Sequence, residues 1–307
     1  MELQITAFKN VLELVRNFST EQKCNEHLEA MRWNGQIVSP FNKDSKVYKC
    51  AGGKYKCKIT GKYFNVRTGT IFDDTKIPLQ KWFIAIYLIA NHKKGISSHQ
   101  LARDLSITQK SAWFVLHRVR YAFGHENFKK EMKGTIEVDE TFVGGKETNK
   151  HSNKKIKGSQ GGANKAIVFG ALERGGDVQA QTISERNSKT LLPIINNIVQ
   201  TGSTIMSDEL KSYRPLKKNY THLSINHAGG EYVDGNTHIN SIENFWSLFK
   251  RGIIGIYHYT SKKHLQKYID EFSYRYNTRT LTQEVRFNLL LNSVSKKITY
   301  KQLTSHE

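Results

Sequence analysis

The chain is short of cysteine, of long hydrophobic runs and of acidic residues. Its 307 residues include only three cysteines, too few for a disulfide framework, so we expect its environment to be a reducing cytoplasm. No apolar run approaches the length that spans a bilayer. The first residues carry acids early and no small-residue cleavage site, which argues against a signal peptide. These absences exclude a disulfide-stapled scaffold and a membrane-spanning protein.

Excess positive charge is the most informative property of the composition. The chain has 47 Lys and Arg residues against 27 Asp and Glu residues, a net charge of +20 and a pI near 9.7. Solubility does not require such an excess, which favours a polyanionic partner. The sequence also lacks the basic amphipathic anchor typical of proteins that bind membrane surfaces. We therefore expect nucleic acid as the partner, and no membrane.

Residues 1–75 are predicted to form a helix followed by a small, ribbon-like module of short strands and turns. A zinc ribbon needs two Cys-x-x-Cys knuckles, but here the first knuckle position runs from Ser39 to Asn42 and the second from Cys57 to Thr60. Only one of the four expected thiolates remains, so we predict a metal-free module and no zinc cofactor. An alternative metal set without ribbon spacing would consist of Cys24, His27, Cys50 and Cys57.

Residues 76–130 show the pattern of a helix-turn-helix after one buried helix. The apolar stretch 77–91 is followed by a short helix, a tight turn at 106–108 and a longer helix at 109–123. Plain helical hairpins share this pattern, but the positive charge of the chain favours DNA binding. The residues expected to contact DNA are Gln109, Lys110 and Ser111 at the start of the second helix, with Arg118 further along it.

The order of elements in residues 131–307 predicts an α/β domain of the ribonuclease H-like class. A strand carrying Asp139, a hairpin, a helix, a strand ending at Asp208, a further strand and a helix follow one another. In that architecture the first and fourth strands lie side by side at the centre of a mixed five-stranded sheet. Asp139 and Asp208 would then meet, and the helix that follows could lay Glu243 over them.

Three carboxylates in one pocket need cations to offset their repulsion. Each pair of charges ~4 Å apart repels by on the order of 4 kcal/mol at an effective dielectric of about 20. All-oxygen ligand sets select Mg²⁺ or Mn²⁺ over Zn²⁺, and two such ions activate a water or a 3′-hydroxyl in phosphodiester chemistry. We therefore predict that Asp139, Asp208 and Glu243 are catalytic residues and ligands of two Mg²⁺ or Mn²⁺ ions.

The helix predicted from residue 238 to 253 carries two polar groups opposite an aromatic face. Lys250 lies two turns after Glu243, so both side chains project from the same face. We expect Lys250 and Arg251 to contact DNA phosphates. Trp246 follows the spacing of the apolar face, which favours a core residue over a base-stacking one.

Other polar residues near the predicted site have secondary roles or none. Glu137 shares the strand face of the first aspartate, and we expect a solvated edge residue, with an outer-shell role as the alternative, while Glu140 points to the opposite face. His238 has two open roles, orienting substrate or capping the helix, and no histidine is assigned as a ligand. The lysine- and glycine-rich stretch 146–165 is expected to be flexible, and the helices within 261–294 are expected to close the sheet.

The sequence resembles the bacterial insertion-sequence transposases of the DDE type, in the subgroup with an N-terminal zinc ribbon. The matching segments occur in the family's order and are RWNGQIV, FNVRTGTIF, IEVDETFVGGK, SDELKSY and the run from His238 to Arg279. The resemblance implies that Asp139, Asp208 and Glu243 form the catalytic metal-binding triad, that Lys250 contacts DNA, and that the protein works at the bacterial nucleoid. Some relatives use an asparagine as the third ligand, which makes Asn240 the alternative to Glu243. Oxygen side chains at Ser39, Asn42 and Thr60 replace the family's ribbon cysteines.

The resulting functional prediction is a transposase that binds the terminal inverted repeats of its own element. It would cut the element ends and join their 3′-hydroxyls to target DNA, which requires a homodimer or larger synaptic assembly to hold two ends together. Two alternatives remain open from the residues alone. One is a catalytically idle DNA-binding regulator, and the other is a structure-selective nuclease on the same fold.

Overall fold

The chain divides into two compact units, each described here by itself. The computed structural model describes residues 7–124, 126–128, 130–145, 165–225, 238–295 and 297–304. One unit comprises Met1–His125 with Thr280–Glu307, and the other comprises Glu126–Arg279. The ribbon-like module and the helix-turn-helix therefore share a unit, whereas the sequence predicted separate segments at 1–75 and 76–130. The last residues of the chain also join this unit instead of the predicted domain at 131–307.

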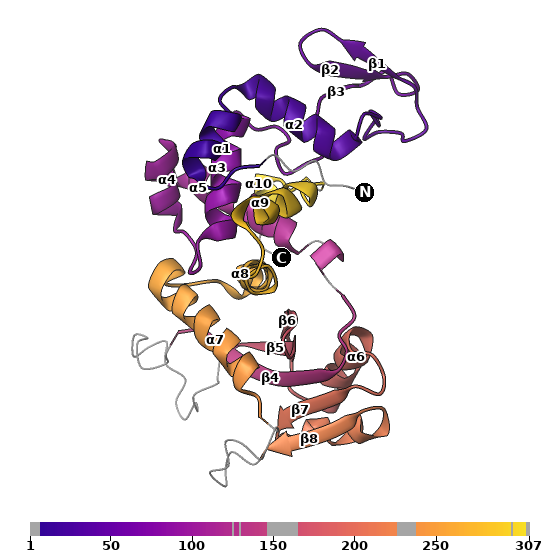
Figure 1. The fold of residues 1–307 in the computed structure, drawn as a ribbon, viewed down its shortest axis with the longest axis vertical. Helices are drawn as coiled ribbons and strands as arrows, with labels where there is room; N and C mark the ends of the chain where they lie inside the picture. The colour runs from indigo at the N-terminus through magenta and orange to yellow at the C-terminus, as the bar shows by residue number, and fades with distance from the viewer. Residues whose placement is uncertain are drawn as a thin grey trace. The chain divides into compact units, whose positions relative to one another are not determined.

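The first unit is a helical assembly around one buried helix. Helix α3 (Leu79–Asn91) has eight buried residues, as its nearly continuous apolar sequence predicts. Phe83 of this helix makes edge contacts with Phe18 and Phe287, so the C-terminal helix α9 (Gln283–Asn292) packs against α3 within this unit, whereas the sequence predicted that it closes the sheet. The helices of this unit are α1 (Val11–Asn17), α2 (Glu21–Trp33), α3 (Leu79–Asn91), α4 (Ser98–Leu105), α5 (Gln109–Phe123), α9 (Gln283–Asn292) and α10 (Tyr300–Thr304) (Figure 1).

The predicted ribbon-like module is a three-stranded antiparallel sheet of β1 (Val47–Cys50), β2 (Lys54–Cys57) and β3 (Tyr63–Phe64). A small aromatic core holds it, because the ring of Tyr55 contacts those of Trp33 and Phe64. An aromatic core of this kind supplies part of the stability that a metal supplies in small folds.

Hydroxyl and amide oxygens form the turns at the two knuckle positions. Ser39 Oγ accepts from the amide of Phe41, Asn42 Oδ1 from that of Asp44, and Thr60 Oγ1 from that of Lys62. Each is a local turn in which a side-chain oxygen bonds the amide two residues on. The buried thiol of Cys57 donates to Ser45 Oγ at 3.2 Å. Oxygen side chains therefore shape both turns of the module.

The second unit is built on a mixed five-stranded sheet in the order β6-β5-β4-β7-β8. Strands β4, β5 and β6 are antiparallel neighbours, β7 runs parallel to β4, and β8 runs parallel to β7. Helix α6 (Ser188–Ile198) makes the crossover from β6 to β7. This is the predicted ribonuclease H-like topology. The strands are β4 (Thr135–Val143), β5 (Ala166–Glu173), β6 (Val178–Ile183), β7 (Thr204–Asp208) and β8 (Thr221–Ile225).

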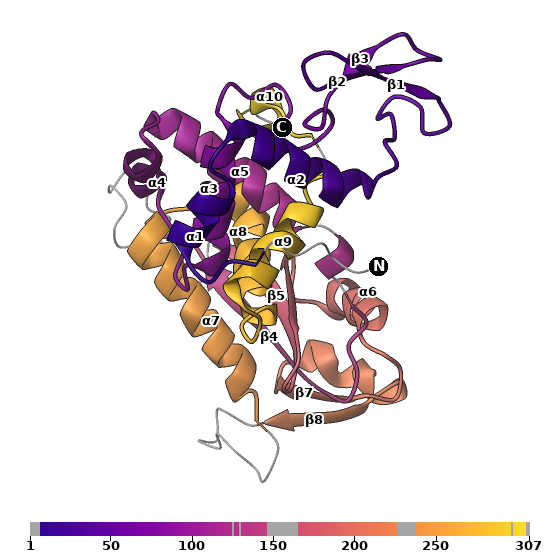
Figure 2. The ribbon, with the colours of Figure 1, turned by 45° about the horizontal axis from the view of Figure 1, so that its top comes forward.

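Helices cover both faces of this sheet (Figures 1 and 2). Helices α7 (Asn240–Gly252) and α8 (Lys262–Asn277) pack on one face with the π-helical turn η6 (Ile253–Tyr257). Helix α6 and the 3₁₀ helix η4 (Lys211–Lys218) pack on the other. Ile136 and Val138 of β4 belong to the α6 core, so the alternate residues of the strand face α7. The short 3₁₀ helix η1 (Glu126–Phe128) precedes the sheet.

None of the helices described here combines the length and the apolar character that a membrane span requires.

Candidate active site

Two predicted catalytic aspartates lie on the adjacent central strands β4 and β7. The parallel register pairs Thr135 with Thr204 and Glu137 with Met206. Carried two residues further, this register sets Asp139 level with Asp208 on the same sheet face. Asp208 ends its strand and its Oδ1 accepts from the amide of Leu210 at 3.1 Å. This local turn orients the carboxylate beyond the strand end.

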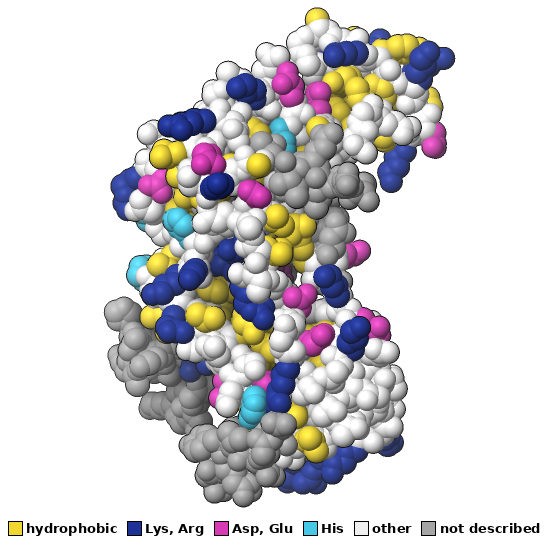
Figure 3. Space-filling model, viewed as in Figure 1, with side chains coloured by type: hydrophobic (Ala, Val, Ile, Leu, Met, Phe, Trp, Pro, Cys, Tyr) yellow, Lys and Arg dark blue, Asp and Glu magenta, His cyan; other side chains and the backbone are white. Residues whose placement is uncertain are grey.

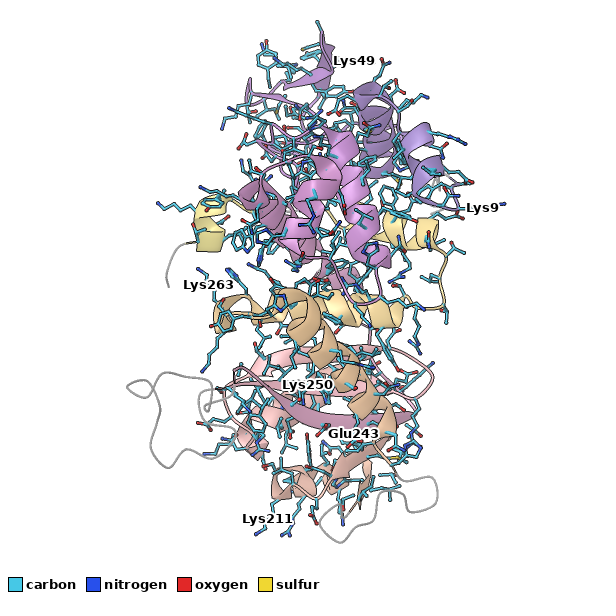
Figure 4. All side chains as sticks on the ribbon, turned by 90° about the vertical axis from the view of Figure 1, so that its left-hand side faces the viewer. Lys9, Lys49, Lys211, Glu243, Lys250 and Lys263 are labelled. Carbon is cyan, nitrogen blue, oxygen red and sulfur yellow. The ribbon has the colours of Figure 1, made fainter. Side chains whose placement is uncertain are left out.

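The third acid comes from helix α7, which crosses the same face. Glu243 is exposed on this helix, and Ile242, Phe245 and Phe249 beside it are buried. Figure 4 shows Glu243 and Lys250 along the exposed side of α7. Trp246 is only 4% exposed, which confirms the prediction of a core residue. The apolar side of α7 thus anchors the helix, while the acid projects from it.

A glycine on β5 allows α7 to approach the sheet closely beside Asp139. Gly170 pairs with Asp139 across the β4–β5 ladder. A Cβ atom on this glycine would lie 2.6 Å from Trp246 Cζ2 and 3.0 Å from Ile242 Cδ1. Only glycine therefore fits beneath the indole ring, which brings the helix that carries Glu243 against the strand pair that carries Asp139.

The electrostatics of Asp139 reflect its crowded surroundings. Burial, together with the negative charges of Asp208 and Glu243, raises the pKa of this carboxyl to about 6, against the opposing effect of the Glu140 backbone. Asp208 and Glu243 therefore both lie within electrostatic range of Asp139. Among the residues that the structure describes, no three acidic, histidine or cysteine side chains lie close enough as positioned to ligate one ion.

Glu140 points to the α6 face, as strand alternation predicts. The hydroxyl of Tyr213, in η4, donates to its carboxylate. Burial, together with the charges of Asp139 and Asp208, raises the pKa of Glu140 to about 7, and Tyr213 and Arg186 oppose this rise. Glu140 therefore has a partner of its own on the far side of the sheet.

Glu137 is not the solvated edge residue that the sequence predicted. It is 0% exposed, and its carboxylate accepts hydrogen bonds from Arg174, from the amides of Ser241 and Ile242 and from the Ser241 hydroxyl. The residue before α7, Ile239, has no side-chain oxygen with which to cap the helix. A helix without a local cap is a signal in the sequence that a distant acceptor is needed.

The predicted DNA contacts divide into exposed and buried residues. Lys250 and Arg251 are exposed on α7, and Gln109 and Lys110 are exposed at the start of α5. Ser111 lies in the same first turn, where its amide donates to Thr108 Oγ1. The short helix, the turn and the longer helix are all present as predicted.

Arg118 is a correction to the predicted DNA-contact set. Its side chain is 3% exposed, and its guanidinium donates to the carbonyls of Ile71, Asp73 and Ile298 at 2.7 to 3.0 Å. Helix α5 is buried on every side around this position, from Val115 to Arg120. Arg118 therefore joins three chain segments of the first unit and is not available to DNA.

Sequence reasoning missed a basic surface that follows Asp208. The 3₁₀ helix η4 buries Tyr213 and Leu216 against the sheet and turns its cations outward. Figure 3 shows dark-blue side chains at the bottom of this unit, and Figure 4 labels Lys211 there. The exposed cations of η4 are Lys211, Arg214, Lys217 and Lys218.

The remaining predicted residues have mixed outcomes. Asn240, the alternative third ligand, is exposed in the first turn of α7. His238 Nδ1 lies 3.5 Å from Glu137 Oε1, and His258 is exposed with its ring near the carbonyl of Ile254. His227 and residues 146–164 of the lysine-rich stretch lie outside the described residues.

Comparisons with known proteins agree with this architecture. The model of the ISXO2-like transposase domain matches residues 131–277. A protein of the transposable element ISH50 from Halobacterium salinarum is 26% identical over 279 residues, which cover 85% of this chain and 92% of that protein. A transposase-like protein from Haemophilus influenzae is 31% identical over 99 residues, covering 32% of this chain and 79% of the relative.

Solved structures with a distant likeness include two Mos1 complexes. The Mos1 strand transfer complex has 12% identity and a TM-score of 0.28, covering 71% of this chain and 79% of that one. The pre-cleavage Mos1 transpososome has 11% identity and a TM-score of 0.27, covering 94% of this chain and 97% of that one.

Proposed function

The chain belongs to the insertion-sequence transposases with an ISXO2-like transposase domain, and on this premise we propose that it cuts and joins DNA with a DDE triad. It binds the terminal inverted repeats of its element, cleaves the ends and joins the 3′-hydroxyls to target DNA. The observation that supports the proposal is the β4–β7 register, which, carried two residues further, sets Asp139 level with Asp208 on the sheet face that α7 covers.

The donor set fits hard divalent cations. Asp139, Asp208 and Glu243 offer only carboxylate oxygens, which suit Mg²⁺ or Mn²⁺. The negative charges of Asp208 and Glu243 raise the pKa of Asp139, and a bound cation would offset this repulsion. Two bound ions would activate a water or 3′-hydroxyl and stabilise the leaving oxygen of the phosphodiester. The chain itself orients the carboxylates, through the Asp208 turn and through the packing of Trp246 over Gly170.

Positive charge on exposed elements supports DNA as the partner. Lys250 and Arg251 on α7 lie on the same helix as Glu243, and the exposed cations of η4 follow Asp208 in the chain. Gln109, Lys110 and Ser111 are the proposed base-reading residues of the helix-turn-helix. Because joining needs two element ends at once, we propose a homodimer or larger synaptic assembly.

The decisive experiment incubates purified protein with labelled element ends, target DNA and Mg²⁺ or Mn²⁺. We expect Asp139→Asn, Asp208→Asn and Glu243→Gln each to abolish cleavage and joining while DNA binding stays within about twofold of wild type. The exposed neighbour Glu209 supplies the matched control, and Glu209→Gln should join ends normally.

Each other outcome has a definite meaning. Normal joining by any one of the three variants removes that residue from the triad, and loss of joining in Asn240→Ala but not in Glu243→Gln makes Asn240 the third ligand. Cleavage without joining by the wild-type protein identifies a nuclease. Binding without cleavage identifies a DNA-binding regulator.

A further inference from the structure

Helix α7 begins without a cap of its own. The first amides of a helix have no acceptor within the helix and need one from elsewhere. The residue at the N-cap position, Ile239, makes no side-chain hydrogen bond to them. Glu137 of strand β4 supplies the acceptor, because its Oε2 accepts from the amides of Ser241 at 2.8 Å and Ile242 at 3.0 Å. Its Oε1 also accepts from the Ser241 hydroxyl at 3.0 Å.

Arg174 extends this cap to the chain that enters the helix. Its Nε donates to Glu137 Oε1 at 2.7 Å, and its Nη2 donates to the carbonyl of His238 at 2.7 Å. Its own amide donates to the carbonyl of Thr135, on the same strand as Glu137. The guanidinium thus holds the residues just before α7 against the start of strand β4.

The charge of Glu137 is compensated although its carboxylate is fully buried. The guanidinium of Arg174 lies against one oxygen, and the positive end of the α7 dipole lies against the other. A buried carboxylate without such partners is costly, and removing one partner of a buried pair is strongly destabilising. The arrangement therefore holds only while α7 stays in this position on the sheet.

The place of Glu137 in the chain gives the cap a second consequence. It lies two residues before Asp139 on β4, on the same strand face, and it bonds the helix two residues before Glu243. One side chain therefore joins the strand of the first acid directly to the helix of the third. On the strand side, all of these hydrogen bonds are made by the Glu137 carboxylate, which is completely buried and therefore held in place.

We propose that Glu137 is a positioning residue that sets the distance between Asp139 and Glu243, and thereby the geometry in which the triad holds divalent cations. This inference rests on the proposed function. The aromatic anchor of α7 around Trp246 keeps the helix on the sheet, whereas the Glu137 cap fixes its N-terminal end. Loss of the cap frees the first turn, which carries Glu243, without detaching the helix.

The test compares Glu137→Gln with Glu271→Gln. Glu271 is also 0% exposed and also pairs with an arginine, Arg275, so the two variants remove similar buried charges. Glu271 lies on α8, however, and does not cap α7. Mn²⁺ binding to the purified protein is measured by titration, and joining is measured against Mn²⁺ concentration. Partners of metal ligands typically change metal affinity or activity by about 10- to 100-fold when mutated, so we expect Glu137→Gln to weaken Mn²⁺ binding at least tenfold while Glu271→Gln leaves it unchanged.

A second variant checks the local chemistry. In Glu137→Gln the new amide group faces the guanidinium of Arg174, donor against donor. Adding Arg174→Gln removes that conflict and lets one amide donate to the other. We expect the double variant to recover part of the lost Mn²⁺ affinity, a coupling that a general loss of stability would not produce.

The outcomes separate this proposal from the proposed function. Equal Mn²⁺ affinity in Glu137→Gln and wild type, or an equal loss in Glu271→Gln, overturns the positioning role. If wild type binds Mn²⁺ but joins no ends, the proposed function fails and the same titration still decides the role of Glu137. If wild type binds no Mn²⁺, both proposals fall.

Discussion

Gly170→Ala is the most direct test of how α7 lies on the sheet. The added methyl would sit 2.6 Å from Trp246 Cζ2, 2.8 Å from Cη2 and 3.0 Å from Ile242 Cδ1. Carbon atoms pack best at about 3.5–4.0 Å, so the indole or the whole helix must move by about 1 Å. Overpacking of this kind costs about 1–3 kcal/mol.

The sign of this effect distinguishes packing from backbone entropy. Replacing a strand glycine by alanine normally stabilises by roughly 0.5–1 kcal/mol, because the unfolded chain loses freedom. At Gly170 we expect the clash to exceed that gain, so the melting temperature should fall by roughly 2–10 °C. Gly145→Ala is the matched control, since a Cβ there meets nothing within 4 Å.

The assay is thermal unfolding of both variants, followed by joining at a permissive temperature. Gly170→Ala should also slow joining, because the displaced helix carries Glu243. Adding Trp246→Phe makes room for the methyl and should recover part of the stability that Gly170→Ala lost, relative to Trp246→Phe alone. A melting temperature for Gly170→Ala equal to or above that of wild type would refute the close packing of α7 on β5.

Three further predictions follow from separate parts of the molecule. Arg118→Met leaves three carbonyls without this donor, two of them in buried contacts, and each unsatisfied buried acceptor costs about 1–3 kcal/mol, so urea unfolding should show a loss of at least about 2 kcal/mol. Lys110→Ala, on the exposed start of α5, should weaken DNA binding with no such loss. The pKa of Asp139 is about 6, above its ordinary value of 3.8, so ionisation costs stability as pH rises from about 4 to about 6. Relative to Asp139→Asn, the wild-type unfolding free energy should fall across that window by about 3 kcal/mol, and a flat difference in urea midpoints would contradict the burial of this carboxyl. Replacing Ser39, Asn42 and Thr60 by cysteine in one variant should let the ribbon-like module bind one zinc ion, measured as metal content. One equivalent of zinc in the wild-type protein would contradict the prediction of a metal-free module.

The five-stranded sheet could be predicted because its signals are local and periodic. Alternation along β4 separates Ile136 and Val138 from Glu137 and Asp139, and the order of elements leaves few ways to arrange five strands. Helical spacing likewise identifies Trp246 and Phe249 as the buried side of α7. Such patterns repeat over many residues, so single exceptions do not obscure them.

Residues whose role depends on a distant partner could not be assigned in the same way. Arg118 has the sequence context of a DNA contact, but the carbonyls that bind it lie 45 to 180 residues away in the chain. Glu137 similarly finds its partners 37 to 105 residues away. Charge and spacing along one element do not reveal which other element lies over it.

The amino-acid sequence alone determined the ribonuclease H-like order of strands and the places of Asp139, Asp208 and Glu243 in that order, since both follow from hydrophobic period and chain connectivity. The tertiary structure alone decided how closely α7 packs on the strands that carry Asp139 and Gly170, and what holds its first turn there. Gly170 is required because the indole of Trp246 packs directly on it, and Glu137 caps α7 because that helix has no cap of its own. Both depend on the packing of α7 against the sheet, which is a long-range contact that no local pattern encodes.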